Sequence, residues 1–283
     1  MTGLMRCGVA AAVVVLCLGQ GVRAETPLER GKALMNGIVA CGNCHTPQGP
    51  NGPVPGMEMA GGTPFDEKPF TAYASNITPD PETGIGRWTD EQLVTAIREG
   101  KRPDGSLIGP PMPYEFYRHL SDGDVRAIVA YLRSVPAVKN AVPKSVYRMP
   151  LPAAYGPPVG SVPDVPRGDR LAYGAYMAGP LGHCLECHTP MLPDGRRDMT
   201  RAGLGGERFT GPWGTTVSRN ITSDKEHGLG LWTDAQIKRA ITEGVRPDGA
   251  RLGPPMAYHF YKSIDDADLS ALVAYLRTLP PRS

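Results

Sequence analysis

Apolar residues recur at helical spacing in two segments that lie 144 positions apart. The first segment opens with Ser121 and Asp124 and has the i, i+3, i+4, i+7 pattern of a helix with one buried face. Its apolar positions are Val125, Ile128, Val129 and Leu132. Those of the second segment are Leu269, Leu272, Val273 and Leu276. We therefore expect one amphipathic helix in each segment.

Capping signals and periodicity predict two further helices in each half of the chain. Thr89 followed by Gln92 is a capping-box pattern, and Thr233 begins the same pattern in the second half. Another helical segment is expected at roughly 27–38, with a counterpart at roughly 167–178. No alternating apolar and polar pattern of any length predicts a β-strand. The fold class expected is therefore all-α.

A repeat at one offset makes the chain an internal duplication. Three segments recur 144 positions apart: Asn76-Ile77-Thr78 with Asn220-Ile221-Thr222, Trp88-Thr89-Asp90 with Trp232-Thr233-Asp234, and Ile108-Gly109-Pro110-Pro111-Met112 with Leu252-Gly253-Pro254-Pro255-Met256. Between the copies, eight prolines from 136 to 166 predict a stiff linker that lies across a domain surface. We expect two tandem domains, 25–138 and 167–283, joined by a Pro-rich linker at 139–166.

The N-terminal segment 1–24 has the composition of a secretory signal peptide. Arg6 is followed by an apolar stretch at 9–18, and Ala24 closes a small-residue cleavage site. The apolar stretch is shorter than the roughly 20 residues that a membrane-spanning helix needs. We therefore expect cleavage after Ala24 and a periplasmic mature protein.

The charge balance of the chain argues against a polyanionic partner. After loss of the leader, the 30 basic residues become 28, against 28 acidic ones, and no basic run stands out. Beyond the leader, no apolar stretch is long enough to cross a bilayer. We therefore expect no nucleic-acid partner, and membrane attachment only through a partner protein.

Two Cys-x-x-Cys-His motifs carry the candidate chemistry. The first consists of Cys41, Cys44 and His45, and the second of Cys184, Cys187 and His188. Thiols three residues apart lie on one side of a helical turn, so both can reach the two vinyl groups on one porphyrin edge. The histidine that follows can then bind the iron. The sequence therefore predicts two covalently attached c-type haems.

Zinc sites and disulfides are the competing interpretations of paired Cys-x-x-Cys segments. Four thiolates could bind one zinc ion only if the two halves met. Neither alternative explains why a histidine directly follows the second thiol in both copies. The other two cysteines, Cys7 and Cys17, fall in the leader, so none is left for a structural disulfide framework or a catalytic thiol. Haem attachment is therefore favoured.

The order of helix, Cys-x-x-Cys-His, long loop, helix, Pro-rich loop with Met and C-terminal helix resembles the class I cytochrome c fold, twice over. In that family the sixth iron ligand is a methionine on the loop ahead of the last helix, and the matching residues are Met112 and Met256. Both follow Gly-Pro-Pro, which fixes the backbone.

Methionine also fills gaps in protein cores, and histidines could compete as ligands. The remaining histidines are His119, His183, His227 and His259. None has a histidine at its repeat-equivalent position, so methionine ligation is favoured.

The resemblance also implies roles for other repeated residues. It implies that the first and last helices of each domain cross where a glycine admits a tyrosine ring. These pairs are Gly31 with Tyr131 and Gly174 with Tyr275. Candidates near a haem propionate are Trp88 and Trp232, with Asn76, Asn220, Arg102 and Arg246 as further candidates. A core aromatic residue and a solvated arginine explain the same pattern equally well.

More closely, the chain is similar to the multihaem cytochrome c subunits of periplasmic alcohol, aldehyde and sugar-acid dehydrogenase complexes, through its Asn-Ile-Thr, Trp-Thr-Asp and Pro-x-Met-Pro-Tyr segments. Those subunits commonly hold three haems, whereas this chain has two motifs and carries Ala257 where the last pattern has Pro. The resemblance implies an electron-transfer protein rather than an enzyme. Its donor would be a periplasmic dehydrogenase, and its acceptor a soluble cytochrome, quinone or terminal oxidase.

Two enzymes with one haem open to substrate are the alternatives. They are a di-haem peroxidase and a sulfur-compound dehydrogenase built on the same domains. With histidine on one side and methionine on the other, an iron has no vacant position for substrate. A matched methionine in both copies therefore favours electron transfer. A zinc-binding interaction module is a third class, and it would show no visible absorption.

Overall fold

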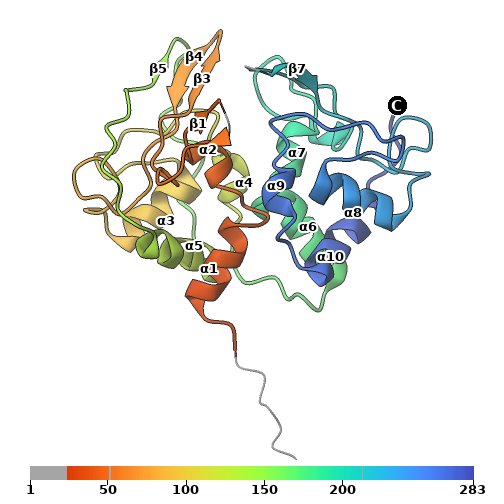
Figure 1. The fold of residues 1–283 in the computed structure, drawn as a ribbon, viewed down its shortest axis with the longest axis horizontal. Coiled ribbons are helices and arrows are strands. Elements are labelled where there is room, and N and C mark those ends of the chain that lie inside the picture. The colour runs from red at the N-terminus through yellow and green to blue at the C-terminus, as the bar shows by residue number, and fades with distance from the viewer. Residues whose placement is uncertain (1–23, 51, 212) are drawn as a thin grey trace, which may run out of the picture.

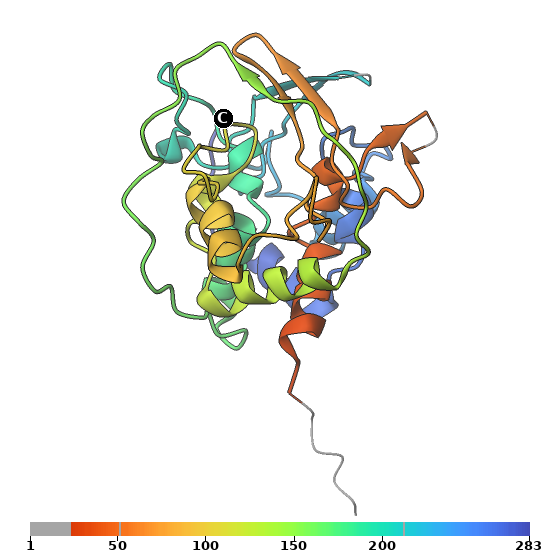
Figure 2. The ribbon, with the colours of Figure 1, turned by 90° about the vertical axis from the view of Figure 1, so that its left-hand side faces the viewer.

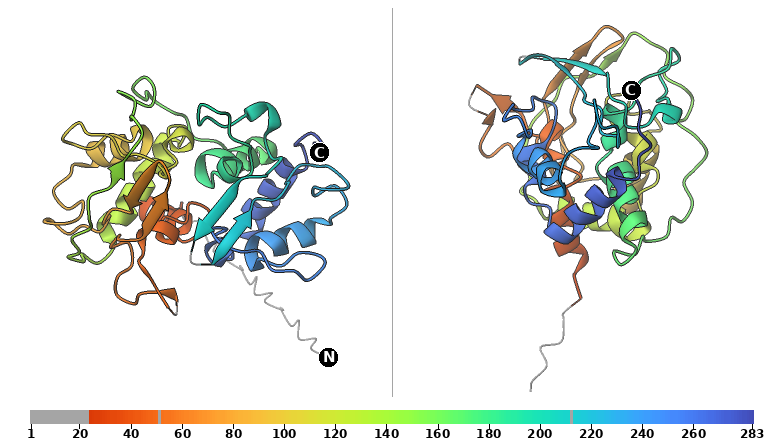
Figure 3. Two further views of the ribbon diagram at one scale, coloured as in Figure 1. Left: turned by 90° about the horizontal axis from the view of Figure 1, so that it is seen from above. Right: turned by 90° about the vertical axis from the view of Figure 1, so that its right-hand side faces the viewer.

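The computed structural model describes residues 24–50, 52–211 and 213–283. The expected signal peptide, 1–24, lies outside the described residues except for Ala24. The described elements gather in two halves that lie side by side (Figures 1 and 3). No helix of this described part is both long enough and apolar enough to cross a bilayer.

The two halves share one framework, in which two helices, a β-hairpin and three further helices follow in the same order. The first half contains α1 (Pro27–Met35), α2 (Gly42–His45), β1 (Gln48–Gly49), β2 (Gly52–Pro53), β3 (Pro64–Glu67), β4 (Phe70–Tyr73), α3 (Asp90–Glu99), α4 (Tyr114–Tyr117) and α5 (Asp122–Ser134). The linker adds β5 (Val146–Tyr147). The second half contains α6 (Arg170–Tyr176), the π-helix η1 (Met177–Leu181), α7 (Cys184–Cys187), the 3-10 helix η2 (Met199–Arg201), β6 (Arg208–Gly211), β7 (Gly214–Val217), α8 (Asp234–Glu243), α9 (Tyr258–Tyr261) and α10 (Asp266–Leu276).

Local sequence signals account for the ends of α3 and α8. Thr89 and Thr233 each close a capping box with the glutamine three residues later, as the sequence predicted. Both helices end at a glycine in the left-handed region, Gly100 with φ 62° and Gly244 with φ 65°. The same C-terminal glycine therefore sets the direction in which the following loop leaves the helix in both halves.

The all-α fold class was wrong, because the described part of the chain also forms three small antiparallel sheets. These are β1–β2, β3–β4–β5 and β6–β7, with Pro64 opposite Tyr73 and Arg208 opposite Val217. Each strand has only two to four residues, which is too short for an alternating pattern to stand out from the sequence. Backbone hydrogen bonds in these short hairpins hold the strands, rather than a continuous apolar face.

Each half is built on a crossing of two helices at a glycine. A Cβ atom at Gly31 of α1 would lie 1.9 Å from the backbone oxygen of Ala127 in α5 and 2.9 Å from Cβ of Tyr131. A Cβ atom at Gly174 of α6 would lie 2.1 Å from the oxygen of Ala271 in α10. Only glycine lets these backbones approach so closely, so the expected packing role of the two glycines is confirmed.

One hydrophobic cluster continues from the first half into the second. Its fully buried side chains include Met35, Leu120 and Ile128 from the first half and Met177 and Leu272 from the second. Apolar surface that separate halves would expose to water is therefore covered where they meet.

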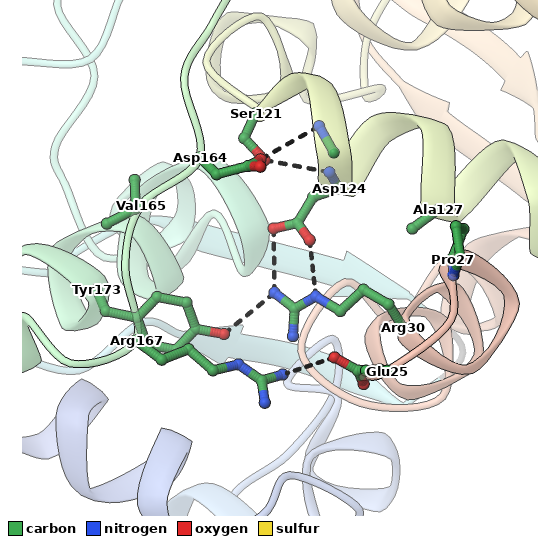
Figure 4. Close-up of a pocket in the computed structure, with 11 residues that line it drawn as sticks. Glu25, Pro27, Arg30, Ser121, Asp124, Ala127, Asp164, Val165, Arg167 and Tyr173 are labelled. Atoms are coloured by element: carbon green, nitrogen blue, oxygen red, sulfur yellow. Dashed lines mark hydrogen bonds and ion pairs between the residues drawn. The ribbon is translucent and has the colours of Figure 1, made fainter. Parts of the chain in front are cut away.

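A polar network joins the two halves beside a cavity of about 270 Å³ (Figure 4). Arg30 pairs with Asp124 at 2.7 Å and donates to the Tyr173 hydroxyl of the second half at 3.1 Å. The Tyr176 hydroxyl, also from the second half, donates to the Asp124 carboxylate at 2.9 Å. Because these bonds involve charged groups with little solvent exposure, they fix how α6 sits against α1 and α5.

The Pro-rich linker lies along the surface of the first half, as expected, and Figure 2 shows its green trace there. Its strand β5 pairs with β4, with Phe70 opposite Tyr147. Farther along, Arg118 donates to the backbone oxygen of Tyr155 at 2.6 Å, and the Asp122 carboxylate accepts from the Ser161 hydroxyl at 2.6 Å. The linker is therefore bound along its length.

Candidate haem-attachment sites

Each Cys-x-x-Cys-His motif forms a single helical turn, α2 in the first half and α7 in the second. The amide of His45 donates to the oxygen of Cys41 at 2.9 Å, and that of His188 donates to Cys184 at 2.9 Å. One turn therefore presents two thiols and one imidazole in both copies, as porphyrin attachment requires.

A strained residue leads into each turn. Ala40 has φ 49° and His183 has φ 37°, and each directly precedes the first cysteine of its motif. A residue other than glycine costs about 1–2 kcal/mol in this left-handed region. The surrounding fold therefore enforces the sharp entry to both turns.

The two motif histidines are fixed by the same kind of bond. Nδ1 of His45 lies 2.7 Å from the backbone oxygen of Ser75, and Nδ1 of His188 lies 2.6 Å from that of Arg219. A carbonyl can only accept, so each Nδ1 is assigned as the donor and Nε2 carries the free lone pair that a metal needs. Surrounding protein lowers the pKa of both rings by desolvation, against the opposing effect of the hydrogen bond, so the neutral form is favoured.

A glycine positions each of these carbonyl groups. The amide of Gly61 donates to the oxygen of His45 at 2.8 Å, and a Cβ atom there would lie 2.4 Å from the carbonyl carbon of Ser75. Gly205 makes the same bond to His188 at 2.9 Å, and its Cβ would lie 2.6 Å from Arg219. The sequence interpretation missed these residues, although the Gly-Gly pair repeats at the offset of 144.

The four motif thiols lie in a protein environment that disfavours their charged form. Burial raises the pKa of Cys41 to about 12 and that of Cys44 and Cys184 to about 11, and it raises the pKa of Cys187 as well. None of the four is in a disulfide. Within the described residues, no group of three or more His, Cys, Asp or Glu side chains converges as a metal site would. Desolvated thiols with one imidazole in each turn therefore fit covalent haem attachment better than a zinc knot.

The two candidate methionine ligands occupy matching loops. Met112 and Met256 are both half-buried and pack against the hydrophobic cluster. The amide of Ile108 donates to Gly100 at 2.7 Å, and Leu252 donates to Gly244 at 2.8 Å, so both loops start from the glycine stop of the preceding helix. Ligation of iron by these two residues stays a prediction.

The candidates for a haem propionate have other partners. The Asn76 side chain donates to the oxygen of Val138 at 2.7 Å and accepts from Thr78, and Asn220 donates to the oxygen of Arg282 at 2.6 Å. These amides are therefore used to hold loops.

The arginine candidates are engaged as well. Arg102 donates to the oxygen of Leu107 at 2.5 Å, and Arg246 lies 3.2 Å from the Asp248 carboxylate. The indoles of Trp88 and Trp232 pack against the core, and their propionate role stays a prediction.

The two motif turns face each other where the halves meet (Figure 1). The Asn43 side chain, inside the first motif, donates to the oxygen of Pro255 at 3.2 Å, directly before Met256. The His183 ring packs edge-on against Tyr117, with ring centroids 5.7 Å apart. Both attachment sites therefore lie at a shared interface rather than on opposite sides of the molecule.

Known proteins resemble the chain over nearly its whole length. A family model described as Cytochrome c matches residues 28–136. A protein named "Diheme cytochrome c-type" from Cereibacter sphaeroides is 31% identical over 250 residues, covering 85% of this chain and 82% of that protein.

Two further relatives are named as subunits of dehydrogenases. The fructose dehydrogenase cytochrome subunit of Gluconobacter japonicus is 33% identical over 306 residues, covering 97% of this chain and 59% of that protein. The gluconate 2-dehydrogenase cytochrome c subunit of Pantoea cypripedii is 31% identical over 261 residues, covering 84% and 56% respectively. The chain thus spans less than three fifths of the length of these two relatives.

Proposed function

The chain belongs to the cytochrome c family, and on that basis we propose that it is a periplasmic di-haem cytochrome c that carries electrons from a partner dehydrogenase to a respiratory acceptor. The observation that carries this proposal is the pair of matched attachment turns, each with an oriented neutral imidazole, at one interface. A repeated site of this kind suits a relay better than a single catalytic centre.

In each half, different side chains would attach the haem and ligate its iron. Bound haem supplies a one-electron couple. Cys41, Cys44, Cys184 and Cys187 would attach the two haems, and His45, Met112, His188 and Met256 would ligate the iron. Carbonyl bonds keep each imidazole in one orientation, and Gly-Pro-Pro keeps each thioether loop in place. Ligands held in this way stay the same in both oxidation states, which suits rapid electron transfer.

The proposed donor follows from the relatives. The fructose dehydrogenase and gluconate 2-dehydrogenase relatives are named as cytochrome subunits, and this chain resembles them over most of its length. We propose the same division of labour here, with a separate dehydrogenase as donor and a soluble cytochrome, quinone or terminal oxidase as acceptor. The signal-like composition of 1–24 supports a periplasmic location.

Purified holoprotein provides the direct test. A pyridine haemochrome assay should give two haems per chain, and a spectroelectrochemical titration should show two one-electron steps. The ferric protein should be low-spin, with the weak far-red absorption of methionine-ligated haem. Substrate plus the catalytic subunit of a fructose or gluconate dehydrogenase supplies a ready donor for reduction assays.

Access to the iron separates this proposal from the alternatives. A reduced protein ligated on both faces should not bind carbon monoxide. Binding of carbon monoxide at one haem would favour the peroxidase or the sulfur-compound dehydrogenase, and a colourless protein would contradict haem attachment altogether.

A further inference from the structure

Two tyrosines of the linker contact the Met112 loop on its two sides. The Tyr147 hydroxyl donates to the oxygen of Pro110 at 3.2 Å. Its ring also covers Gly109, where a Cβ atom would lie 2.4 Å from two ring carbons. The Tyr155 ring stacks on Tyr114, with centroids 3.4 Å apart and planes inclined by 20°. The linker therefore contacts the loop that carries Met112 both before and after the methionine.

Both tyrosines are held by contacts of their own, and that of Tyr155 is the bond that its backbone oxygen accepts from Arg118 at 2.6 Å. Tyr147 belongs to strand β5 and pairs with Phe70 of β4, with ring centroids 6.0 Å apart. Next to it, Arg148 donates to the oxygens of Lys68 and Glu67, at 3.0 and 2.6 Å. The linker is therefore fixed to the sheet of the first half, and it can resist movement of the loop.

In the part of the second half that the structure describes, no pair of tyrosines covers the Met256 loop, which is instead contacted by Asn43 through its 3.2 Å bond to the oxygen of Pro255. The position that matches Gly109 is Gly253, where the nearest atom to an added Cβ is the Thr216 hydroxyl oxygen at 3.0 Å. Tyr258, the counterpart of Tyr114, packs edge-on against its neighbour His259, with ring centroids 6.0 Å apart. The two methionine loops, otherwise alike, therefore differ in what lies over them.

We propose that Tyr147 and Tyr155 are positioning residues that hold the Met112 loop closed, so that the first site exchanges its methionine less readily than the second. The proposal rests on the proposed function, in which Met112 and Met256 are axial ligands. Displacing Met112 requires its loop to move, and that movement must break the Tyr147 hydrogen bond and slide Tyr114 from under Tyr155. Displacing Met256 must break one hydrogen bond, from Asn43 to the oxygen of Pro255, but it does not have to separate a stacked pair of rings.

Competition with imidazole measures this difference in the ferric holoprotein. Added imidazole replaces methionine, and loss of the far-red absorption reports the exchange. We expect two phases in the wild type, the weaker one belonging to the first site. A Met256→Ala variant assigns the phases, because only the first site can then show the band.

The tyrosine variants should act on one phase alone. Tyr147→Phe removes one hydrogen bond, so we expect imidazole to bind the first site about threefold to tenfold more tightly. Tyr155→Ala removes an aromatic stack and should have an effect of similar or larger size. The matched control is Val146→Ala, which changes the exposed neighbour on β5 and should leave both phases unchanged.

The outcomes separate the two proposals. If the wild type shows no far-red band, methionine ligation fails, and the proposed function must be revised. If the band is present but Tyr147→Phe and Tyr155→Ala leave the first phase unchanged, the positioning role is overturned while the cytochrome assignment stands. Equal shifts of both phases would also overturn it, because the linker would then affect the whole molecule. Tyr147→Phe keeps the ring and the packing, so the test does not depend on a variant that fails to fold.

Discussion

Gly61→Ala tests how the fold orients the imidazole of the first motif. The added Cβ would lie 2.4 Å from the carbonyl carbon of Ser75 and 2.5 Å from the oxygen of Ala74. Ordinary contacts begin at 3.4 Å, so this segment must retreat by about 1 Å. The Ser75 oxygen would move with it and lose its 2.7 Å bond from Nδ1 of His45.

The free-energy cost has two parts. An alanine at φ 74° costs about 1–2 kcal/mol in backbone strain. Forcing two backbone segments apart costs about 1–3 kcal/mol more. We therefore expect the free energy of unfolding to fall by about 2–5 kcal/mol. The adjacent Gly62→Ala is the matched control, because φ is 99° but the nearest atom is 3.6 Å away, so only the strain should remain.

Guanidinium denaturation of the holoprotein measures the loss of stability. A spectroelectrochemical titration measures the loss of the hydrogen bond between His45 and Ser75, through the midpoint potential of the haem. A hydrogen bond from Nδ1 makes the imidazole a stronger donor to the iron, which favours the ferric state. Its loss should raise the midpoint potential of one haem and leave the other unchanged. Gly205→Ala should raise the other potential, and its neighbour Gly206→Ala, with no atom within 4 Å, should raise neither.

The reasoning fails if Gly61→Ala and Gly62→Ala have the same stability and the same two potentials. It also fails if Gly61→Ala changes both potentials equally, because the effect would then come from general loosening rather than from the Ser75 carbonyl.

Three further predictions concern stability and are measured by denaturant unfolding of the holoprotein. Gly31→Ala should lower the free energy of unfolding by about 1–3 kcal/mol, because the helix crossing must open, whereas Gly168→Ala, with open space around it, should change it by no more than about 0.5 kcal/mol. Arg133→Ala removes the guanidinium that donates to the oxygens of Ile85 and Trp88, so we expect a loss of about 2–3 kcal/mol, with partial recovery in Arg133→Lys. Bonds from the Ser161 hydroxyl and then Arg98 lower the pKa of Asp122 to about 2, below its unfolded value near 3.8, so its contribution is present at neutral pH and is lost as pH falls from 3.8 through 2. Asp122→Asn should therefore be less stable than the wild type at pH 6, and the gap should close below pH 3.

Features that depend on neighbours in the sequence could be predicted. The capping boxes at Thr89 and Thr233, the amphipathic stripe that begins at Val125 and the single-turn geometry of the motifs all depend on residues within two helical turns. Because the second half repeats the first, each prediction for the first half could also be made for the second. The helix crossing at Gly31 is a contact between distant segments, and it was accessible only through resemblance to a family.

Contacts between distant segments could not be predicted from the sequence. Strand β4 pairs with the linker, where Tyr147 lies 77 residues after its partner Phe70, and β4 has no alternating pattern of its own that would mark it as a strand. Gly61 looks like an ordinary turn glycine until its distance to Ser75 is known. The Asn43 bond to Pro255 joins residues 212 positions apart, and no local pattern encodes it. These positions are set by tertiary packing, which local propensity does not describe.

The halves differ most where the repeat is broken, and several of those breaks lie at the interface and the linker. Asn43 of the first motif is replaced by Glu186 in the second, and Glu186 lies 2.9 Å from Nδ1 of His183 within its own half, whereas Asn43 reaches across to the Met256 loop. The linker reaches the Met112 loop through Tyr147 instead. Each methionine loop is thus contacted by a segment from outside its own repeat, and the two segments differ in kind. We therefore expect substitutions at Asn43 or Tyr147 to change the difference between the two sites in midpoint potential and ligand exchange. Substitutions at positions that the two halves share should change that difference less.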